Sequence, residues 1–87
     1  MIEYEIEVVN RAGIHTRPAA MIVKLAAKFK SDIYLNRDGF SINAKSIIGV
    51  MSLTAEYGSK LKLICDGIDE EKVVEEISGL FSSGFGE

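Results

Sequence analysis

Residues 2–8 read Ile-Glu-Tyr-Glu-Ile-Glu-Val, an alternation of apolar and acidic side chains. Successive side chains of a β-strand point to opposite faces, so this alternation predicts a strand with one buried and one solvated face. Sheets of this one-sided kind are typically antiparallel and are covered by other elements on the apolar side. The rest of the chain must therefore supply further strands and a helical cover.

Three later stretches show the same two-residue period. Residues 33–35 and 40–42 predict two strands, and Asp38-Gly39 between them is typical of a tight hairpin turn. Residues 61–65 alternate leucine or cysteine with lysine or isoleucine and predict a fourth strand. Cys65 falls on the apolar side of this strand, where we expect it to pack in the core.

Helical spacing appears in three other stretches. Pro18 suits the first turn of a helix whose apolar face comprises Ala19, Ile22, Val23, Ala26 and Phe29. Residues 46–53 predict a short second helix with Ser46 as its N-cap. For the last helix we expect Asp69 as the cap and a hydrophobic staple between Ile68 and Val73. Its buried stripe is expected to comprise Val73, Val74, Ile77, Leu80 and Phe81.

The order β-α-β-β-α-β-α predicts an α+β fold in one domain spanning residues 1–87. Helices on one face of a four-stranded antiparallel sheet would cover the apolar sides of all its strands, giving an open-faced β-sandwich. A chain of 87 residues supports one modest core, so any chemistry is expected near the surface.

Charge is distributed unevenly along the chain. The net charge is -3, which argues against a nucleic-acid binder that works by neutralising phosphates. Residues 66–87 carry seven acidic side chains and one basic one, and we expect this segment to be an acidic, solvated face.

The single cysteine excludes an internal disulfide, and no apolar run is long enough for a membrane span. The amino terminus lacks the basic start and apolar stretch of a signal peptide. We therefore expect a cytoplasmic protein that binds no nucleic acid, does not insert into membranes and acts as a monomer.

His15 is the only histidine, and it directly precedes a predicted helix. A helix N-terminus presents unpaired N–H groups and partial positive charge, so it binds anions and disfavours an imidazolium. A neutral imidazole there keeps a lone pair that can attack phosphorus, and Arg17 offers donors for phosphoryl oxygens. A lone loop histidine is also typical of an ordinary solvated residue, so the local pattern leaves both interpretations open.

Other kinds of site find little support. One histidine, one cysteine and scattered acids form no recognisable metal-ligand spacing, and no dinucleotide or P-loop fingerprint is present. We expect no metal and no cofactor. An RNA-binding or amino-acid-sensing module of similar shape is a competing class, but the acidic balance fits RNA recognition poorly.

Two motifs resemble those of the HPr family, the histidine phosphocarriers of the bacterial phosphoenolpyruvate:sugar phosphotransferase system. Residues 13–19, Gly-Ile-His-Thr-Arg-Pro-Ala, are similar to the family's active-site loop. Residues 43–53, Asn-Ala-Lys-Ser-Ile-Ile-Gly-Val-Met-Ser-Leu, resemble its regulatory-serine helix. The resemblance extends over nearly the whole chain in length, element order and motif spacing.

The resemblance implies specific roles. His15 would accept a phosphoryl group on Nδ1 from enzyme I, Arg17 would balance its charge, and IIA domains of sugar permeases would receive it. The chain would thus be a phosphoryl carrier and not a stand-alone catalyst. Ser46 would be a regulatory phosphorylation site, which makes an HPr kinase/phosphorylase and a transcription regulator further candidate partners.

Helix spacing also predicts a partner-binding surface. Ile47, Ile48 and Met51 are expected to form an apolar patch near His15, because the short helix cannot bury all its apolar side chains, and Val50 and Leu53 are better core candidates. The first helix would add Thr16, Ala20, Met21 and Lys24. The alternatives are a helix buried wholly in the core and an ordinary solvated helix face.

Some positions depart from the family pattern. Thr16 stands where many members have alanine. Arg11-Ala12 stands directly before the Gly-Ile-His segment, where small or apolar residues are commoner. Residues 80–85 are reminiscent of the nitrogen-related paralogue NPr. The alternative function is therefore an NPr-like or regulatory phosphorelay that is not coupled to sugar transport.

Overall fold

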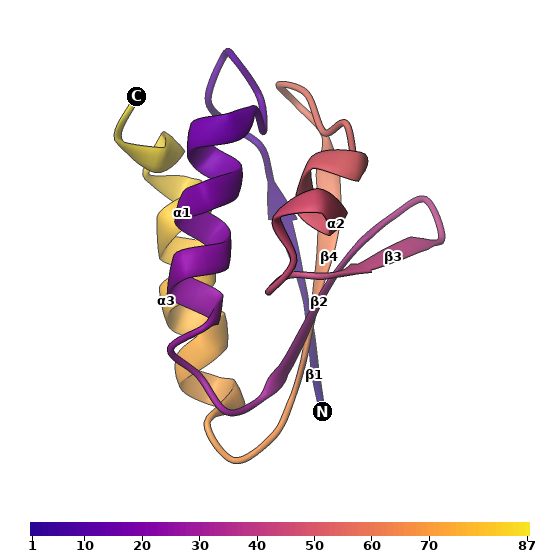
Figure 1. The fold of residues 1–87 in the computed structure, drawn as a ribbon, viewed down its shortest axis with the longest axis vertical. Helices are drawn as coiled ribbons and strands as arrows, with labels where there is room; N and C mark the ends of the chain where they lie inside the picture. The colour runs from indigo at the N-terminus through magenta and orange to yellow at the C-terminus, as the bar shows by residue number, and fades with distance from the viewer.

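A computed structural model describes all 87 residues, and its elements follow the expected order β-α-β-β-α-β-α. Its strands and helices are β1 (Ile2–Glu7), α1 (Thr16–Ala26), β2 (Asp32–Arg37), β3 (Phe40–Asn43), α2 (Ile47–Ser52), β4 (Lys60–Asp66) and α3 (Glu70–Ser82). A short 3-10 turn, η1 (Gly84–Gly86), follows α3 and ends the chain beside the start of α1 (Figure 1).

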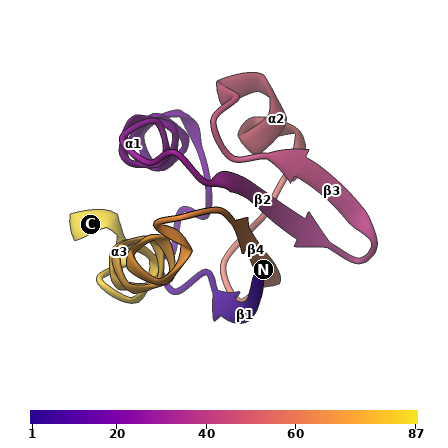
Figure 2. The same cartoon turned by 90° about the horizontal axis from the view of Figure 1, so that it is seen from below.

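The four strands form one sheet in the order β1-β4-β2-β3, and every pairing is antiparallel. Leu63 of β4 lies opposite both Tyr4 of β1 and Leu35 of β2, so the last strand fills the centre of the sheet. The three helices cover one face, and the other face is open (Figure 2). The expected open-faced sandwich is confirmed. None of the helices has the length and apolar character needed to cross a membrane.

Alternation along the strands places their apolar side chains under the helices. Leu35 and Leu63 are fully buried, and Ile6 is nearly so. Ile22 of α1 and Ile77 of α3 are fully buried in the same core, on the side of the sheet that the helices cover. Burying each such side chain contributes roughly 1.5–3 kcal/mol, which is why the alternating pattern dominates the choice of fold. Cys65 is buried as expected, and burial, with the nearby Glu70 carboxylate, raises the pKa of its thiol to about 11.

The β2–β3 hairpin has the tight turn that Asp38-Gly39 predicts. Arg37 pairs with Phe40, and both turn residues adopt positive φ, 51° at Asp38 and 86° at Gly39. These angles are those of a type I′ turn, whose twist matches that of the strands.

The start of α3 differs from the prediction. The Asp69 side chain makes no capping hydrogen bond. Its carboxylate instead accepts hydrogen bonds from the backbone N–H groups of Lys30 (2.9 Å) and Ser31 (3.0 Å) and from the Ser31 hydroxyl. Asp69 therefore connects α3 to the segment between α1 and β2. A capping rule considers only neighbouring residues, so it does not predict these long-range hydrogen bonds.

One further expectation for the C-terminal third was wrong. Ile68 is 91% exposed, so it forms no hydrophobic staple with the buried Val73. The acidic side chains of residues 66–87 are exposed or half-exposed, as expected. Phe85 in the same segment is fully buried and packs edge-to-face on Phe81 with the ring centroids 4.9 Å apart. Phe85 thereby fastens the end of the chain to the fold.

The Asp69 contacts predict a pH-dependent contribution to stability. The Ser31 hydroxyl and then the Lys30 amide lower the pKa of Asp69 from 3.8 to about 2 in the folded protein. A lowered carboxyl pKa stabilises the folded state above the unfolded pKa, and this contribution is lost as pH falls from about 4 to about 2. Asp69→Asn should therefore be less stable than the original protein at neutral pH, with the gap narrowing below pH 4.

Urea unfolding at a series of pH values measures this gap. Asp38→Asn, at the exposed hairpin tip, is the matched control and should show no comparable narrowing. A constant difference between Asp69→Asn and the original protein from pH 7 to pH 2 would contradict the assignment.

Candidate functional site

His15 occupies the N-cap position of α1. Its backbone is extended (φ -91°, ψ -166°), and its side chain makes no capping hydrogen bond to the helix. The N–H groups of the first turn are therefore not capped by this side chain, and they add partial positive charge to the site. The imidazole is 43% exposed, so it is accessible from solvent. This is the junction at which an anion is expected to bind.

The loop before His15 is held by a close backbone approach. The Ile14 N–H donates to the Ala55 carbonyl oxygen at 2.8 Å, and Ile14 itself is buried. Gly13 has φ 72°, and a Cβ at this position would lie 2.8 Å from the Ala55 oxygen and 2.9 Å from Glu56 Cα. Only glycine fits both the conformation and the space. The loop between α2 and β4 thus fixes where α1 begins.

A carboxylate joins the two residues that the motif singles out. Glu87 Oε2 lies 2.8 Å from His15 Nε2 and 3.7 Å from Arg17 Nη1. The Arg17 side chain is 63% exposed and can reorient toward an incoming anion. His15 and Arg17 are therefore brought together, as expected.

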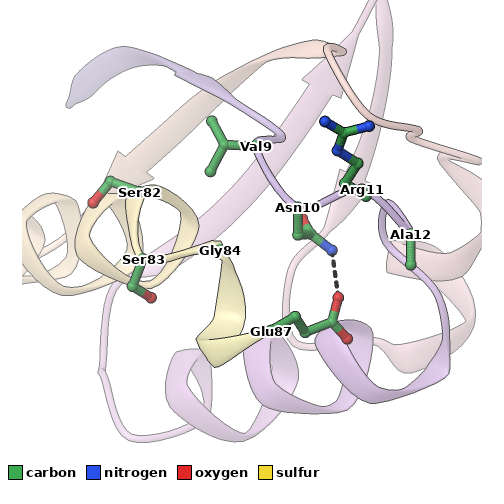
Figure 3. A pocket seen from close by; sticks show the side chains of 8 residues that line it. All are labelled: Val9, Asn10, Arg11, Ala12, Ser82, Ser83, Gly84 and Glu87. Carbon is green, nitrogen blue, oxygen red and sulfur yellow. Dashed lines mark hydrogen bonds between the residues drawn. The ribbon is translucent and has the colours of Figure 1, made fainter.

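Asn10 and Glu87 are site residues that the sequence analysis missed. Asn10 Nδ2 donates to Glu87 Oε1 at 3.0 Å and to the Gly13 carbonyl oxygen at 2.7 Å. Figure 3 shows the Asn10 and Glu87 side chains pointing toward each other at the edge of an open depression of about 440 Å³. No local sequence pattern could have found this pair, because Asn10 and Glu87 are 77 positions apart.

The hydrogen bond from Asn10 is the main cause that lowers the pKa of the Glu87 carboxyl, and the contacts with His15 and Arg17 act in the same direction. Glu87 is therefore ionised at neutral pH. No group of three or more histidine, cysteine, aspartate or glutamate side chains lies close enough together to hold a metal ion.

The second motif forms α2, which packs beside α1. Ser46 is the N-cap, as predicted, and its hydroxyl oxygen accepts a hydrogen bond from the Gly49 N–H at 3.1 Å. Ile48 is 80% exposed, and Ile47 and Met51 are exposed to a lesser degree, whereas Val50 and Leu53 are in the core. The expected division of α2 into core and surface side chains is therefore confirmed.

The α1 residues of the expected partner surface are also accessible. Thr16, Ala20 and Lys24 are exposed, and Met21 is partly buried against the core. We call the set of Thr16, Ala20, Met21, Lys24, Ile47, Ile48 and Met51 the α1–α2 surface. It combines apolar contact area with one lysine on two helices that lie side by side.

Comparison with known proteins places this geometry in a family. The family described as "PTS HPr component phosphorylation site" matches residues 2–83. The phosphocarrier protein HPr of Treponema pallidum is 47% identical over 87 residues, covering 100% of this chain and 99% of that protein. The HPr-like protein Crh of Bacillus subtilis is 41% identical over 78 residues, covering 90% of this chain and 92% of that protein.

Solved structures agree with the sequence comparisons. A crystal structure of HPr from Thermoanaerobacter tengcongensis has a TM-score of 0.96 and 45% identity, covering 100% of this chain and 98% of that one. The fold and the histidine-bearing junction define an open-faced sandwich of the phosphocarrier class. The chain belongs to the HPr family of the phosphotransferase system.

Gly13 provides a test of how the site loop is held. Gly13→Ala must adopt an unfavourable φ and also press its Cβ into the backbone of the loop at Ala55. Gly39→Ala is the matched control, because its φ is 86° and nothing lies within 4 Å of the added Cβ. A left-handed alanine costs about 1–2 kcal/mol, and overpacking adds roughly 1–3 kcal/mol. In chemical denaturation, Gly13→Ala should therefore lower the free energy of unfolding by about 1 kcal/mol or more beyond the decrease caused by Gly39→Ala. If the two variants lost the same free energy of unfolding, the close approach of Gly13 to the Ala55 backbone would be refuted.

Proposed function

We propose that the chain accepts a phosphoryl group on His15 from phosphorylated enzyme I and passes it to IIA domains of sugar permeases. Membership of the HPr family supports this assignment. One observation carries this assignment: the His15 imidazole is accessible at the start of α1, and it makes no capping hydrogen bond to the helix. Such a residue combines a nucleophilic nitrogen with an anion-binding helix end.

Arg17 would share the charge of the transferred group. Its guanidinium lies 3.7 Å from the carboxylate that contacts His15, so it already faces an anion beside the imidazole. A guanidinium offers several N–H donors in one plane, which suits phosphoryl oxygens. In this proposal the carrier needs no metal, and its partners supply the rest of the transition-state environment.

The α1–α2 surface would dock both partners. Its exposed isoleucines and methionine offer apolar contact area, and Lys24 offers charge complementarity to acidic partner residues. We also propose that the chain works as a cytoplasmic monomer. Its relatives include the structure described as an HPr dimer from Thermoanaerobacter tengcongensis, so light scattering of the purified protein tests this part.

A regulatory phosphorelay without sugar transport is the second candidate function. Similarity to Crh, described as "the Bacillus subtilis Catabolite Repression HPr", favours it. A genome that encodes no sugar permease of this system would support the regulatory phosphorelay. In that function the protein that receives the phosphoryl group differs, and the chemistry at His15 is the same.

Loss of His15 tests the carrier function directly. After incubation with phosphoenolpyruvate and enzyme I, the protein should gain one acid-labile phosphoryl group, located on His15 by mass spectrometry. His15→Ala should gain none, because His15 is the only histidine of the chain. Lys72→Ala, on the exposed side of α3, is the control and should be labelled like the original protein. Labelling at another residue, or none, would overturn the proposal.

Ser46 would be a regulatory phosphorylation site for an HPr kinase/phosphorylase. A phosphoryl group there would place about two negative charges at the start of α2, directly before the exposed Ile47 and Ile48. Helix stability would hold, because negative charge is favourable at that end. Partner docking would weaken, because an apolar contact area would have to accommodate a charge. The phosphorylated form would then be free to bind a different partner, such as a transcription regulator.

Ser46→Asp should bind enzyme I about tenfold more weakly or worse, because a charge beside a docking surface costs affinity. Ser46→Asn is the matched control, since asparagine also caps helices but carries no charge, and it should bind like the original protein. Isothermal titration calorimetry measures both. Equal affinity of the aspartate and asparagine variants would contradict the regulatory role.

A further inference from the structure

Thr54 follows α2 in a backbone conformation that its side chain disfavours. Its φ is 48°, in the left-handed region, and it is the only β-branched residue of the chain with a positive φ. A branched Cβ is crowded by the neighbouring carbonyl oxygen in this region, so such residues are rarely found there. Strain of this kind persists only where the surrounding structure holds the backbone. Contacts around Thr54 must therefore keep the turn in place.

The Arg37 guanidinium supplies these contacts. Arg37 Nη1 donates to the Leu53 carbonyl oxygen at 2.9 Å and to the Thr54 carbonyl oxygen at 2.8 Å. These carbonyls lie at the end of α2, where carbonyl groups lack helical partners and partial negative charge accumulates. They belong to the two peptide groups that flank the Thr54 Cα atom. Charged donors make stronger hydrogen bonds than neutral ones, so Arg37 fixes both peptide groups and with them the conformation of Thr54.

Arg37 holds this turn from another part of the fold. It ends β2 and pairs with Phe40 across the tight hairpin, so its backbone belongs to the sheet. Its side chain is 27% exposed, and the partial exclusion of water strengthens its hydrogen bonds. The Thr54 hydroxyl adds one more hydrogen bond, donated to the Leu53 carbonyl oxygen at 2.7 Å. The strained turn is therefore held by a strand and not only by its own neighbours.

The residue after Thr54 makes the contact that holds the site loop. Ala55 is buried, and its carbonyl oxygen accepts a hydrogen bond from the Ile14 N–H at 2.8 Å. The peptide group that joins Thr54 to Ala55 is the one whose carbonyl Arg37 holds. Ile14 in turn directly precedes His15. Ala55, one hydrogen bond and Ile14 thus connect the turn to the residue that carries the imidazole.

We propose that Arg37 is a positioning residue for His15. It holds Thr54 in the left-handed conformation, and this conformation aims the Ala55 carbonyl at the Ile14 N–H. The hydrogen bond in turn sets where α1 and its imidazole begin. The inference rests on the proposed carrier function, because the position of the imidazole matters for phosphoryl transfer. Arg37 acts through the turn, and contact with the transferred group is not part of this role.

A purely structural role for Arg37 makes a different prediction. The lost hydrogen bonds would then lower the stability of the whole fold, and all buried amides would lose protection together. A positioning role predicts a local effect at Ile14 that depends on the strain at Thr54. Glycine adopts a positive φ without this strain, so Thr54→Gly should make the turn independent of Arg37. Restoration by this second substitution separates the two roles.

The test compares Arg37→Met, Thr54→Gly and the double variant with the original protein. Methionine keeps an unbranched side chain but donates no hydrogen bond. Lys62→Met is the matched control, since it also removes one positive charge but lies on the exposed side of β4, in an ion pair with Glu3. Thermal unfolding shows at which temperature all variants are folded. If Arg37→Met does not fold, Arg37→Lys replaces it and should show smaller changes of the same sign, because an ammonium keeps the charge but not the planar donors.

The first readout is native-state hydrogen exchange, which needs no partner protein. The reference is the amide of Ala44, which is also buried and donates to the Ile33 carbonyl oxygen at the same distance of 2.8 Å. In Arg37→Met, exchange at Ile14 should accelerate about tenfold more than exchange at Ala44, because a hydrogen bond to a charged group contributes about a factor of ten or more. Thr54→Gly and the double variant should protect Ile14 much as the original protein does.

The second readout is the rate of His15 phosphorylation by phosphorylated enzyme I, at saturating concentrations of the carrier and at a temperature where every variant is folded. A misplacement of about 1 Å costs up to about 100-fold in rate, and we expect a decrease of about tenfold for Arg37→Met. The double variant should recover most of this loss. Lys62→Met should be phosphorylated like the original protein.

Faster exchange at Ile14 together with slower transfer, both reversed by Thr54→Gly, would support the inference. Equal changes at Ile14 and Ala44, an unchanged transfer rate, or a double variant that behaves like Arg37→Met would each overturn it. If the original protein accepts no phosphoryl group on His15, the carrier function fails and the positioning role fails with it. Exchange at Ile14 still reports whether Arg37 holds the loop, so the two failures are distinguishable.

Discussion

The contact between the loop at Gly13 and the backbone at Ala55 is the constraint on which the site depends. It places Gly13 and Ile14, the two residues before His15, against the segment that joins α2 to β4. The Ile14 hydrogen bond and the absence of a side chain at Gly13 together set this distance. These backbone contacts therefore set the position of the start of α1 relative to the segment that follows α2.

The segment after β1 and the C-terminal end of the chain meet at this arrangement. Asn10 follows β1 and Glu87 is the last residue, and the antiparallel packing of α3 on the sheet returns the chain to the start of α1 (Figure 1). A histidine at an uncapped helix end attracts anions, and here a carboxylate of the protein itself is in contact with the ring. That contact joins two residues 72 positions apart in the sequence.

A chain of 87 residues has little volume for a deep binding pocket. Under the proposed function, partners would therefore be recognised by exposed side chains on α1 and α2 around His15. Two buried side chains, Val50 and Leu53, anchor the short helix α2 in the core. The other apolar side chains of this helix are exposed and available for docking: Ile47, Ile48 and Met51. Ser46 lies at the start of that helix, where a change in charge affects docking more than folding.

The sequence by itself determined the strand pattern, the Asp38-Gly39 hairpin, the positions of the three helices and the place of His15 directly before the first of them. Each of these follows from neighbours a few residues apart, because alternation, helix period and turn chemistry are local properties. Only the tertiary structure decided that Asp69 binds the Ser31 segment, that Ile68 is exposed, and that Asn10 and Glu87 meet at His15. Those contacts join residues 38 to 77 positions apart. Their energies depend on how α3 and the chain end pack on the sheet, and no local pattern encodes that packing.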